Sequence, residues 1–462
     1  MLFTRLAHQC FHRTQIVHVR FSSRSALFVS GKVANQQFAV FKPRIDIDWM
    51  SDHLETLEHV HQKRESSFDV NLLHEDLKNY LDLREQIIGI NSSLEEVQQI
   101  INQRKKEKAD IAEQIMMHKE IKKSLVSIRE SMWQLEEETV INYFKLQNCD
   151  HKSRRDEQVQ YCLRKSLDHQ QMKLSQRELC ERNDLVEFSN VSHSSFYMKN
   201  SLSGLEHKLC RYFTNKLLDH NLEMFSNPDF VRSVMAEGCG HDFMNPEQIF
   251  SLKPTQDLGD RDSCNAVHLV GGASLPSFVA YFARNILQNP AVLPVIMFCV
   301  GRQYSPVTRA DTDLTTSTQS QCVQIFSVSN TEEDMEKQLI FINDILVKIL
   351  SVFPNFTMTE ETIVDCDLCN SRQYRIEMQV RSESSLLYLI LVCQGVESVK
   401  VGSVGVQGKY FSDRVMMVTR DQGPVFTVSA QLDLTKLCAV LVEMSQDQHG
   451  AVDINSVNNW LQ

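Results

Sequence analysis

The chain has 462 residues, more than one ordinary hydrophobic core accommodates, so we expect one large domain and at least one further element. Hydrophobic residues make up 42% of it, and only 10 prolines and 15 glycines occur, which excludes a disordered scaffold. The net charge of -11 at pH 7 excludes a protein coated in basic surface. Any nucleic-acid binding must therefore be confined to a local basic region.

The first 45 residues are rich in arginine and lysine and contain no acidic residue before Asp46. Serines and short apolar runs fill the gaps, as in "MLFTRLAHQCFHRTQIVHVRFSSRSALF". Such a start is typical of a mitochondrial transit peptide, which we assign to 1–25 with an approximate end. The alternative is a disordered basic N-terminus. We find no later segment long and apolar enough to span a membrane, so we expect a soluble protein of the mitochondrial matrix.

Residues 71 to 145 contain two apolar stripes with spacings of three and four, separated by the polar stretch "NQRKKEKAD". This pattern predicts an antiparallel hairpin of two helices, with its tip at the polar stretch, inside an N-terminal arm at 45–147. A helix of about 32 residues would extend on the order of 50 Å, far enough to contact a large partner.

Positive charges are concentrated near the predicted tip of the arm. They are Arg104, Lys105, Lys106, Lys108, Lys119, Lys122 and Lys123. A cationic tip suits binding to a phosphate backbone, whose affinity comes largely from counterion release. Acids are interleaved here, among them Glu107 and Glu120, so a solvated, salt-bridged helical surface is an equal alternative.

A polar linker at 148–185 precedes a region of mixed character at 186–462. Apolar, β-prone runs such as "VLPVIMFCV" and "QGPVFTVSA" alternate with helical patterns such as "EDMEKQLIFINDILVKIL". This arrangement predicts an α+β domain with a largely antiparallel sheet.

The 13 cysteines are expected to stay mostly reduced in a mitochondrial compartment. Cys366 and Cys369 form a CxxC, but no second pair follows at zinc-finger spacing. We interpret both as buried thiols rather than as metal ligands or a redox pair.

The stretch "HLVGGASLPSF" at 268–278 has glycines beside a serine, a combination found in phosphate loops and nucleophile turns. It matches neither the GxxxxGK[ST] phosphate loop nor the GxGxxG dinucleotide turn. Ser274 is not in a GxSxG elbow either. The sequence therefore favours a turn at the end of a strand.

Taken in chain order, several stretches resemble the class II seryl-tRNA synthetases from about residue 45 almost to the C-terminus. "NQRKKEKADI" resembles the family's arm-tip stretch, "KLQN" its linker start, and "SHSSFYMKNSLSGLEHKL" the approach to class II motif 1. Leu205 and Glu206 match the Leu-Glu pair of that motif, and Pro228 resembles its proline. The resemblance implies a class II synthetase-like antiparallel sheet domain preceded by a long antiparallel helical hairpin.

The positions at which that family binds its substrates carry other residues here. Gly272, Ala273 and Ser274 stand where the family binds serine with Thr-Ala-Glu. In motif 2, Gly301 and Gln303 replace the arginine and glutamate of Phe-Arg-x-Glu. Arg302 is one residue out of place, and a shift of one residue on a strand points its side chain to the opposite face.

Further positions of the family's pattern are changed in the same way. The resemblance places Val323 and Phe326 at acidic positions, Leu389 at the metal-binding glutamate, Gly395 at an asparagine, Gly402 and Ser403 at two arginines, and Thr435 and Lys436 at the Gly-Arg of motif 3. Apolar replacements such as Leu389 and Val323 suggest that the site is filled or closed.

We therefore expect 186–462 to be a degenerate catalytic domain that does not activate serine and that binds no metal or cofactor. Adenylate formation depends on arginines and carboxylates that position ATP and its metal ion, and most are missing together. Expected partners are RNA at the arm tip and a second polypeptide at the motif 1 region, as a homodimer or as a heterodimer with the authentic mitochondrial seryl-tRNA synthetase.

Two alternatives stay open. In the first, Lys436 and Arg302 still hold a nucleotide, and the protein is an enzyme with an altered adenylating activity. In the second, the protein is a structural or regulatory partner whose arm binds protein rather than RNA.

Overall fold

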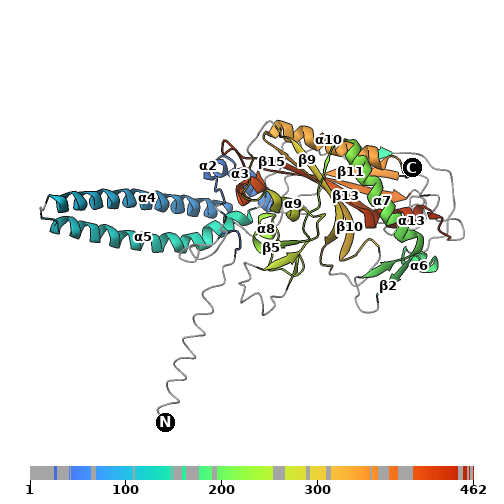
Figure 1. Ribbon diagram of the computed structural model, residues 1–462, viewed down its shortest axis with the longest axis horizontal. Coiled ribbons are helices and arrows are strands. Elements are labelled where there is room, and N and C mark those ends of the chain that lie inside the picture. Colours follow the sequence, from blue (N-terminus) through green and yellow to red (C-terminus); the bar gives the residue numbers. More distant parts are fainter. Residues whose placement is uncertain are drawn as a thin grey trace, which may run out of the picture. The chain divides into compact units, whose positions relative to one another are not determined.

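A computed structural model shows two compact units, an arm unit within Ser23–Gln147 and a sheet unit within Asn148–Gln462 (Figure 1). The residues that it describes are 25–28, 41, 43–63, 69–107, 110–146, 148, 159–162, 176–189, 195–252, 266–287, 292–307, 314–353, 356–362, 374–382, 399–445, 451–454, 457 and 461. Almost all of the predicted transit peptide lies outside them, as do Lys108, Cys366, Cys369, Leu389 and Gly395.

The arm unit is built from helices. They are α2 (Ile47–Asp52), α3 (Leu54–Lys63), α4 (Val70–Lys106) and α5 (Ala112–Lys145). Helices α4 and α5 have 37 and 34 residues and pack side by side as an antiparallel hairpin, with the polar stretch at their turn (Figure 1). Asp69 begins α4 by accepting the Leu72 N–H at 3.0 Å. The predicted hairpin is confirmed.

A polar pair lies within the apolar seam of the hairpin. The Tyr80 hydroxyl donates to the Glu136 carboxylate at 3.1 Å, and both side chains are buried. Burial and the neighbouring Glu136 charge raise the pKa of Tyr80 above its usual range, so the phenol stays protonated as a donor. Sliding one helix along the other would separate the Tyr80 hydroxyl from this acceptor, and the cost favours the observed register of α4 against α5.

The sheet unit contains an eight-stranded sheet with the order β1-β11-β12-β13-β15-β10-β9-β4. Its strands are β1 (Val159–Cys162), β4 (Glu223–Met224), β9 (Val295–Tyr304), β10 (Gln319–Ser329), β11 (Phe356–Thr362), β12 (Tyr374–Ser382), β13 (Val399–Gly408) and β15 (Phe426–Asp433). Neighbours pair antiparallel except for β4, which runs parallel to β9. The predicted α+β fold with a largely antiparallel sheet is confirmed.

Smaller sheets lie beside the large one. Their strands are β2 (Val186–Phe188) with β3 (Phe196–Met198), β5 (Phe230–Arg232) with β7 (Val267–Leu269) and β6 (Phe250–Ser251), and β8 (Ile286–Leu287) with β14 (Val418–Thr419). On β7, the buried His268 contacts the Ser233 and Ser251 hydroxyls at 2.9 and 3.0 Å. Burial lowers the pKa of His268, so a neutral ring joins these segments as a structural link.

Helices cover both faces of the large sheet. They are α6 (Gln176–Arg182), α7 (Asn200–Asp219), α8 (Ser233–Gly238), α9 (Leu275–Phe282), α10 (Glu332–Leu350), α12 (Tyr410–Val415) and α13 (Leu434–Met444). Buried residues such as Phe213 of α7, Ile342 of α10 and Leu437 of α13 form the main core on one face (Figure 1). Helices α9 and α12 pack on the other face. In the part of the chain that is described, no helix is long and apolar enough to cross a membrane.

Candidate functional site

The face of the large sheet opposite α7, α10 and α13 is polar near one end of its central strands. The register aligns Gly301 of β9 with Cys322 of β10, and Cys322 with Asp433 of β15. Side chains alternate between the faces of a strand, so every second residue joins this face. We call it the polar face and define it by Gly301, Gln303, Cys322, Gln324, Gln431 and Asp433.

The turn at 271–274 lies against the polar face and leaves no space for a side chain at Gly272. A Cβ there would lie 2.6 Å from the Asn227 carbonyl oxygen, well inside van der Waals contact. The Gly272 N–H donates to the Asp229 carboxylate at 2.7 Å. The Ser274 hydroxyl, at the N-cap of α9, donates to the Gly271 carbonyl at 2.6 Å and is buried. The serine hydroxyl is thus directed into its own turn.

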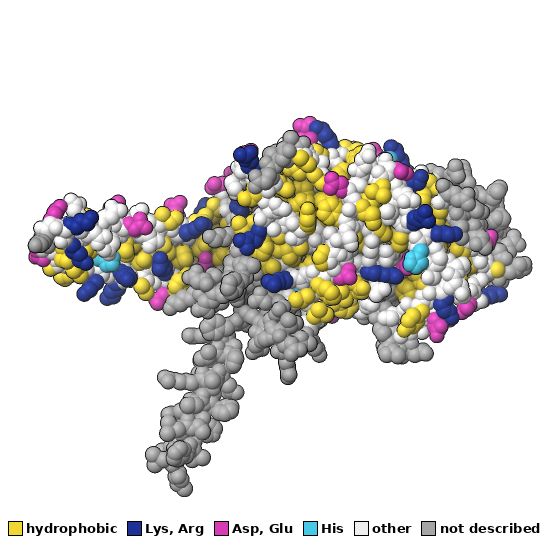
Figure 2. Space-filling model, in the orientation of Figure 1, with side chains coloured by type: hydrophobic (Ala, Val, Ile, Leu, Met, Phe, Trp, Pro, Cys, Tyr) yellow, Lys and Arg dark blue, Asp and Glu magenta, His cyan; other side chains and the backbone are white. Residues whose placement is uncertain are grey.

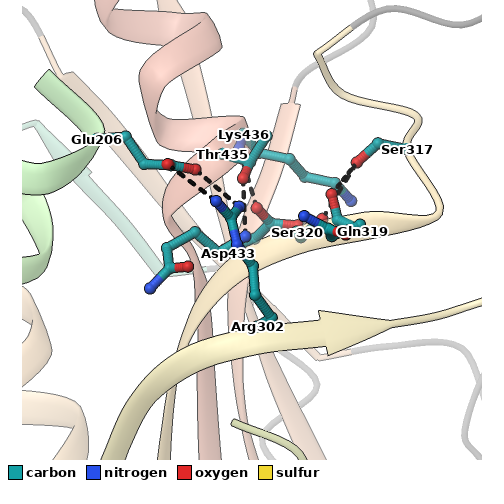
Figure 3. A network of polar contacts seen from close by, with 9 residues as sticks. Glu206, Arg302, Ser317, Gln319, Ser320, Asp433, Thr435 and Lys436 are labelled. Carbon is teal, nitrogen blue, oxygen red and sulfur yellow. Dashed lines mark hydrogen bonds and ion pairs between the residues drawn. The ribbon is translucent and has the colours of Figure 1, made fainter. Parts of the chain in front are cut away.

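Gly301 and Arg302 lie on opposite faces of β9. A Cβ at Gly301 would point toward Ala273 at an ordinary distance of 3.8 Å, so Gly301 faces the turn. The Arg302 guanidinium instead contacts Glu206 of α7, with Nη1 to Oε1 at 3.0 Å and Nη2 to Oε2 at 3.2 Å (Figure 3). The side chain of Glu206 is 8% exposed and that of Arg302 is 38% exposed. This bidentate pair ties α7 to β9.

Val323 and Phe326, the two apolar residues of β10 at acidic positions of the family, also lie on opposite faces of the sheet. Phe326 stacks on Phe278 of α9 with ring centroids 5.7 Å apart, and it contacts Phe411 of α12 at 6.4 Å. Val323 belongs to the core under α7 and α13. The expectation that Val323 helps to fill the site is therefore wrong, because residues three apart on a strand point to opposite faces.

Glutamine and hydroxyl side chains contact one another across the polar face. Gln303 of β9 accepts a hydrogen bond from the Gln431 amide of β15. Deeper in the sheet, the Gln324 amide donates to the Ala430 carbonyl at 3.0 Å, and the Gln407 amide donates to Ser429 at 2.7 Å. These neutral amide and hydroxyl groups offer neither the fixed charge that a phosphate needs nor the carboxylates that a metal needs.

Lys436 lies in the first turn of α13, where Asp433 is the N-cap and accepts the Lys436 N–H at 3.0 Å. Removal from solvent raises the pKa of the Asp433 carboxyl, and the positive charge of Lys436 acts against that rise. The neighbouring Thr435 hydroxyl accepts the Gln321 N–H at 2.8 Å. Motif 3 therefore keeps one positive charge without the planar fork of an arginine.

Gly402 and Ser403 of β13 stand where the family has two arginines, and both are closely surrounded. A Cβ at Gly402 would lie 2.7 Å from the Gln431 carbonyl oxygen, so an arginine there would require the strands to move. Ser403 is buried. Among the described residues, no group of three His, Cys, Asp or Glu side chains is placed to hold a metal ion.

The arm tip presents its cations to solvent. Arg104, Lys105 and Lys106 end α4, and Lys119, Lys122 and Lys123 lie in the first half of α5, all exposed. Figure 2 shows Lys and Arg side chains along the outer part of the hairpin. In the described part of the arm, none of these five lysines forms an ion pair, and Arg104 contacts only the Asp110 carbonyl.

Sequence reasoning did not predict the Glu206–Arg302 pair. Strand alternation placed Arg302 on the face away from Gly301, and Glu206 falls within the buried stripe of α7 that includes Leu205 and Leu209. A buried carboxylate requires a partner, so the position of Glu206 in this stripe could have indicated that a positively charged residue lies nearby. The identity of that partner required the three-dimensional structure, because 96 residues separate the two.

The long helical hairpin and the antiparallel sheet unit define the fold of a class II seryl-tRNA synthetase. Over 90% of the chain, the structure superposes on the seryl-tRNA synthetase of Pyrococcus horikoshii complexed with ATP, with a TM-score of 0.73, 17% identity and 97% of that chain covered. It also matches the cytoplasmic serine-tRNA ligase of Naegleria fowleri in complex with AMP, with a TM-score of 0.68, 12% identity and coverage of 91% and 98% of the two chains.

In sequence, the chain is similar to the Serine--tRNA synthetase-like protein Slimp of Drosophila melanogaster. The two are 24% identical over 445 residues, which cover 91% of this chain and 88% of that protein. The mitochondrial Serine--tRNA ligase of Bos taurus is 29% identical over 143 residues, covering 29% of this chain and 25% of the ligase. No protein-family model matches the chain. The expected resemblance to a seryl-tRNA synthetase-like protein is confirmed.

The lack of space at Gly272 makes a testable prediction about stability. We expect Gly272→Ala to destabilise the sheet unit by about 1–3 kcal/mol, because the added methyl group overpacks the turn. Gly301→Ala is the matched control, since its methyl group meets ordinary contact distances. Urea unfolding of both variants measures the difference, and equal midpoints for the two would contradict the geometry.

Proposed function

We propose that the protein is a noncatalytic paralogue of seryl-tRNA synthetase that acts in the mitochondrial matrix, by binding RNA through its arm and by associating with a polypeptide through its sheet unit. The observation that carries the noncatalytic part is the turn at 271–274. A serine-binding triplet needs side chains that reach the substrate, yet Gly272 has no space for one and Ser274 bonds within the turn.

The nucleotide positions support the same proposal. Gly301 offers no charge for an α-phosphate, and Gln303 is engaged with Gln431. Losing one group that stabilises the transition state typically costs orders of magnitude in rate, and several are changed here together. The alternative of an altered adenylating enzyme is weakened because Arg302 is held by Glu206 on the opposite face, which leaves Lys436 alone.

RNA binding is supported by the exposed lysines of the arm tip, which have no anionic partner in the described part of the arm. Unpaired ammonium groups on a hairpin end can each replace counterions on a phosphate backbone without first breaking a salt bridge. The alternative, a salt-bridged surface, is disfavoured because these lysines form no ion pair with the described residues of the arm.

Location in mitochondria is supported by the acid-poor, Arg-rich N-terminus and by the similarity to a serine–tRNA ligase named as mitochondrial. The matrix is the compartment in which mitochondrial RNA would meet a basic arm.

Association is supported by an apolar patch at the edge of the large sheet. We name it the edge patch and define it by the exposed residues Leu218 of α7, Met224 of β4, Phe230 of β5 and Tyr281 of α9. Strand β4 is the last of the described strands at this end of the sheet, and a sheet edge with exposed apolar neighbours favours pairing with another chain. A second copy of this chain and the authentic mitochondrial seryl-tRNA synthetase are the two partners we propose.

Serine-dependent ATP–pyrophosphate exchange tests the noncatalytic proposal. We expect exchange and serylation of mitochondrial tRNA-Ser at the level of a blank, with an active seryl-tRNA synthetase as the positive control. The double variant Gly301→Arg/Gln303→Glu should stay inactive as well, because the turn at Gly272 still excludes serine-binding side chains. Exchange above the blank in the natural protein would sink the proposal.

Neutralising the arm tip tests the RNA proposal. Replacing Lys105, Lys106, Lys122 and Lys123 by glutamine should weaken binding and flatten the dependence of log K on log salt, by about 0.7 to 0.9 for each lost phosphate contact. The matched control replaces Lys78 and Arg84, exposed cations on α4 away from the tip. An unchanged slope in the tip variant, or crosslinking in mitochondria that labels only polypeptide, favours the protein-binding alternative.

A charge in the edge patch tests the association. Met224→Asp should shift the sedimentation coefficient from that of a dimer to that of a monomer, because a carboxylate in a closed apolar interface loses its hydration. Ile340→Asp, an exposed apolar position on α10, is the control and should leave the assembly intact. Purification with tagged mitochondrial seryl-tRNA synthetase separates the two partners, and a natural protein that is monomeric alone and with that enzyme contradicts the proposal.

A further inference from the structure

A cavity of about 320 Å³ opens on the side of β9 that faces α7, away from the polar face. Strand β3, the first half of α7, β9, the segment that enters β10 and the start of α13 all contribute to it. The lining residues used below are Ser203, Glu206, His207, Arg302 and Thr435. The volume is in the range of small-molecule sites.

The Glu206–Arg302 pair forms one wall of this cavity and fixes the orientation of the guanidinium (Figure 3). A guanidinium has five N–H groups and two edges that can bind an oxyanion bidentately: the end edge between the two Nη atoms and the side edge between Nε and one Nη. Glu206 occupies the end edge with both of its oxygens. Within the described residues, the side edge has no partner, and the Arg302 side chain is 38% exposed.

The charges of the lining residues determine whether the cavity favours an anionic or a cationic ligand. Glu206 is the only carboxylate among the described lining residues, and both of its oxygens are already bonded to Arg302. A cation entering the cavity would therefore find no carboxylate to bind. An oxyanion meets the remaining N–H groups of Arg302, whose plane needs no further ordering because Glu206 holds it.

Neutral donors complete the site. The Thr435 hydroxyl accepts the Gln321 N–H at 2.8 Å, which leaves its own hydrogen available to donate. Ser203 and His207 also line the cavity, and neither has a partner within the described chain. Hydroxyl and imidazole groups of this kind bind the hydroxyl groups of a ligand.

We propose that this cavity binds a small hydroxylated oxyanion, a carboxylate or a phosphate monoester, whose anionic group occupies the side edge of Arg302. The ligand's hydroxyl groups contact Ser203, His207 and Thr435. The site lies on the opposite face of β9 from the polar face, and Thr435 is the one residue named here that also stands at a changed position of the family's pattern, that of the motif 3 glycine. It does not depend on the proposed RNA binding or association.

Saturation-transfer NMR on the full chain tests the site with three matched three-carbon probes: D-glycerate, glycerol 3-phosphate and uncharged glycerol. We expect glycerate, glycerol 3-phosphate or both to bind at least tenfold more tightly than glycerol. The comparison of the two anions assigns the preferred oxyanion. Equal signals from all three probes overturn the proposal.

Variants locate the binding. Ser203→Leu fills the cavity and leaves the Arg302 pair intact, so it should abolish the transfer signal. Ser201→Leu makes the same change on α7 outside the lining and should bind like the natural protein. Arg302→Lys keeps a charge opposite Glu206 but removes the side edge, and we expect at least a tenfold loss. Binding that survives Ser203→Leu shows that the anion is held elsewhere and overturns the proposal.

Discussion

The alternation of side chains along β9 and β10 is the constraint on which the rest of the sheet unit depends. One face must be apolar because α7, α10 and α13 cover it, and residues such as Ile325 and Leu432 meet that need. The other face is held by the same backbone but contributes far less to the main core. Side chains on the polar face can therefore differ with less cost to the main core, and it is there that we propose the substrate-binding pattern is changed.

In the described part of the polar face, main-chain atoms and aromatic rings occupy part of the space. At Gly272 the missing side chain lets the turn approach the Asn227 carbonyl and gain a hydrogen bond to Asp229, so the space is used by main-chain atoms. Phe326, Phe278 and Phe411 occupy the region beside α9 and α12. A side chain at Gly272 or Gly402 would meet atoms that are already in place, whereas a Cβ at Gly301 would meet only ordinary contact distances.

Local patterns explain how much could be predicted from the sequence. The spacing of three and four residues between apolar side chains predicted the helical hairpin, and the polar stretch predicted the position of its turn. The order of the motifs predicted the antiparallel class II sheet. Val323 and Phe326 lie on opposite faces of β10 because side chains alternate along a strand. Which face each of them joins became clear only from the position of β10 in the sheet. The Glu206–Arg302 pair and the cavity beside it join segments far apart in the chain, and one sequence carries no record of such contacts.

Glu206 and Arg302 constrain each other more strongly than the residues of the polar face do, for a physical reason. Removing one member of a buried ion pair leaves the other charged and without a partner, which costs several kcal/mol, roughly 3–5 in fully buried cases and less here because Arg302 is partly exposed. A glycine at 301 on the polar face has no polar side-chain atom that could lose a partner, so it carries no such cost. The two halves of the pair depend on each other for stability, and this dependence explains the pair without reference to adenylation. The pair also leaves a rigidly held guanidinium edge, a chemical property that is independent of the family's reaction.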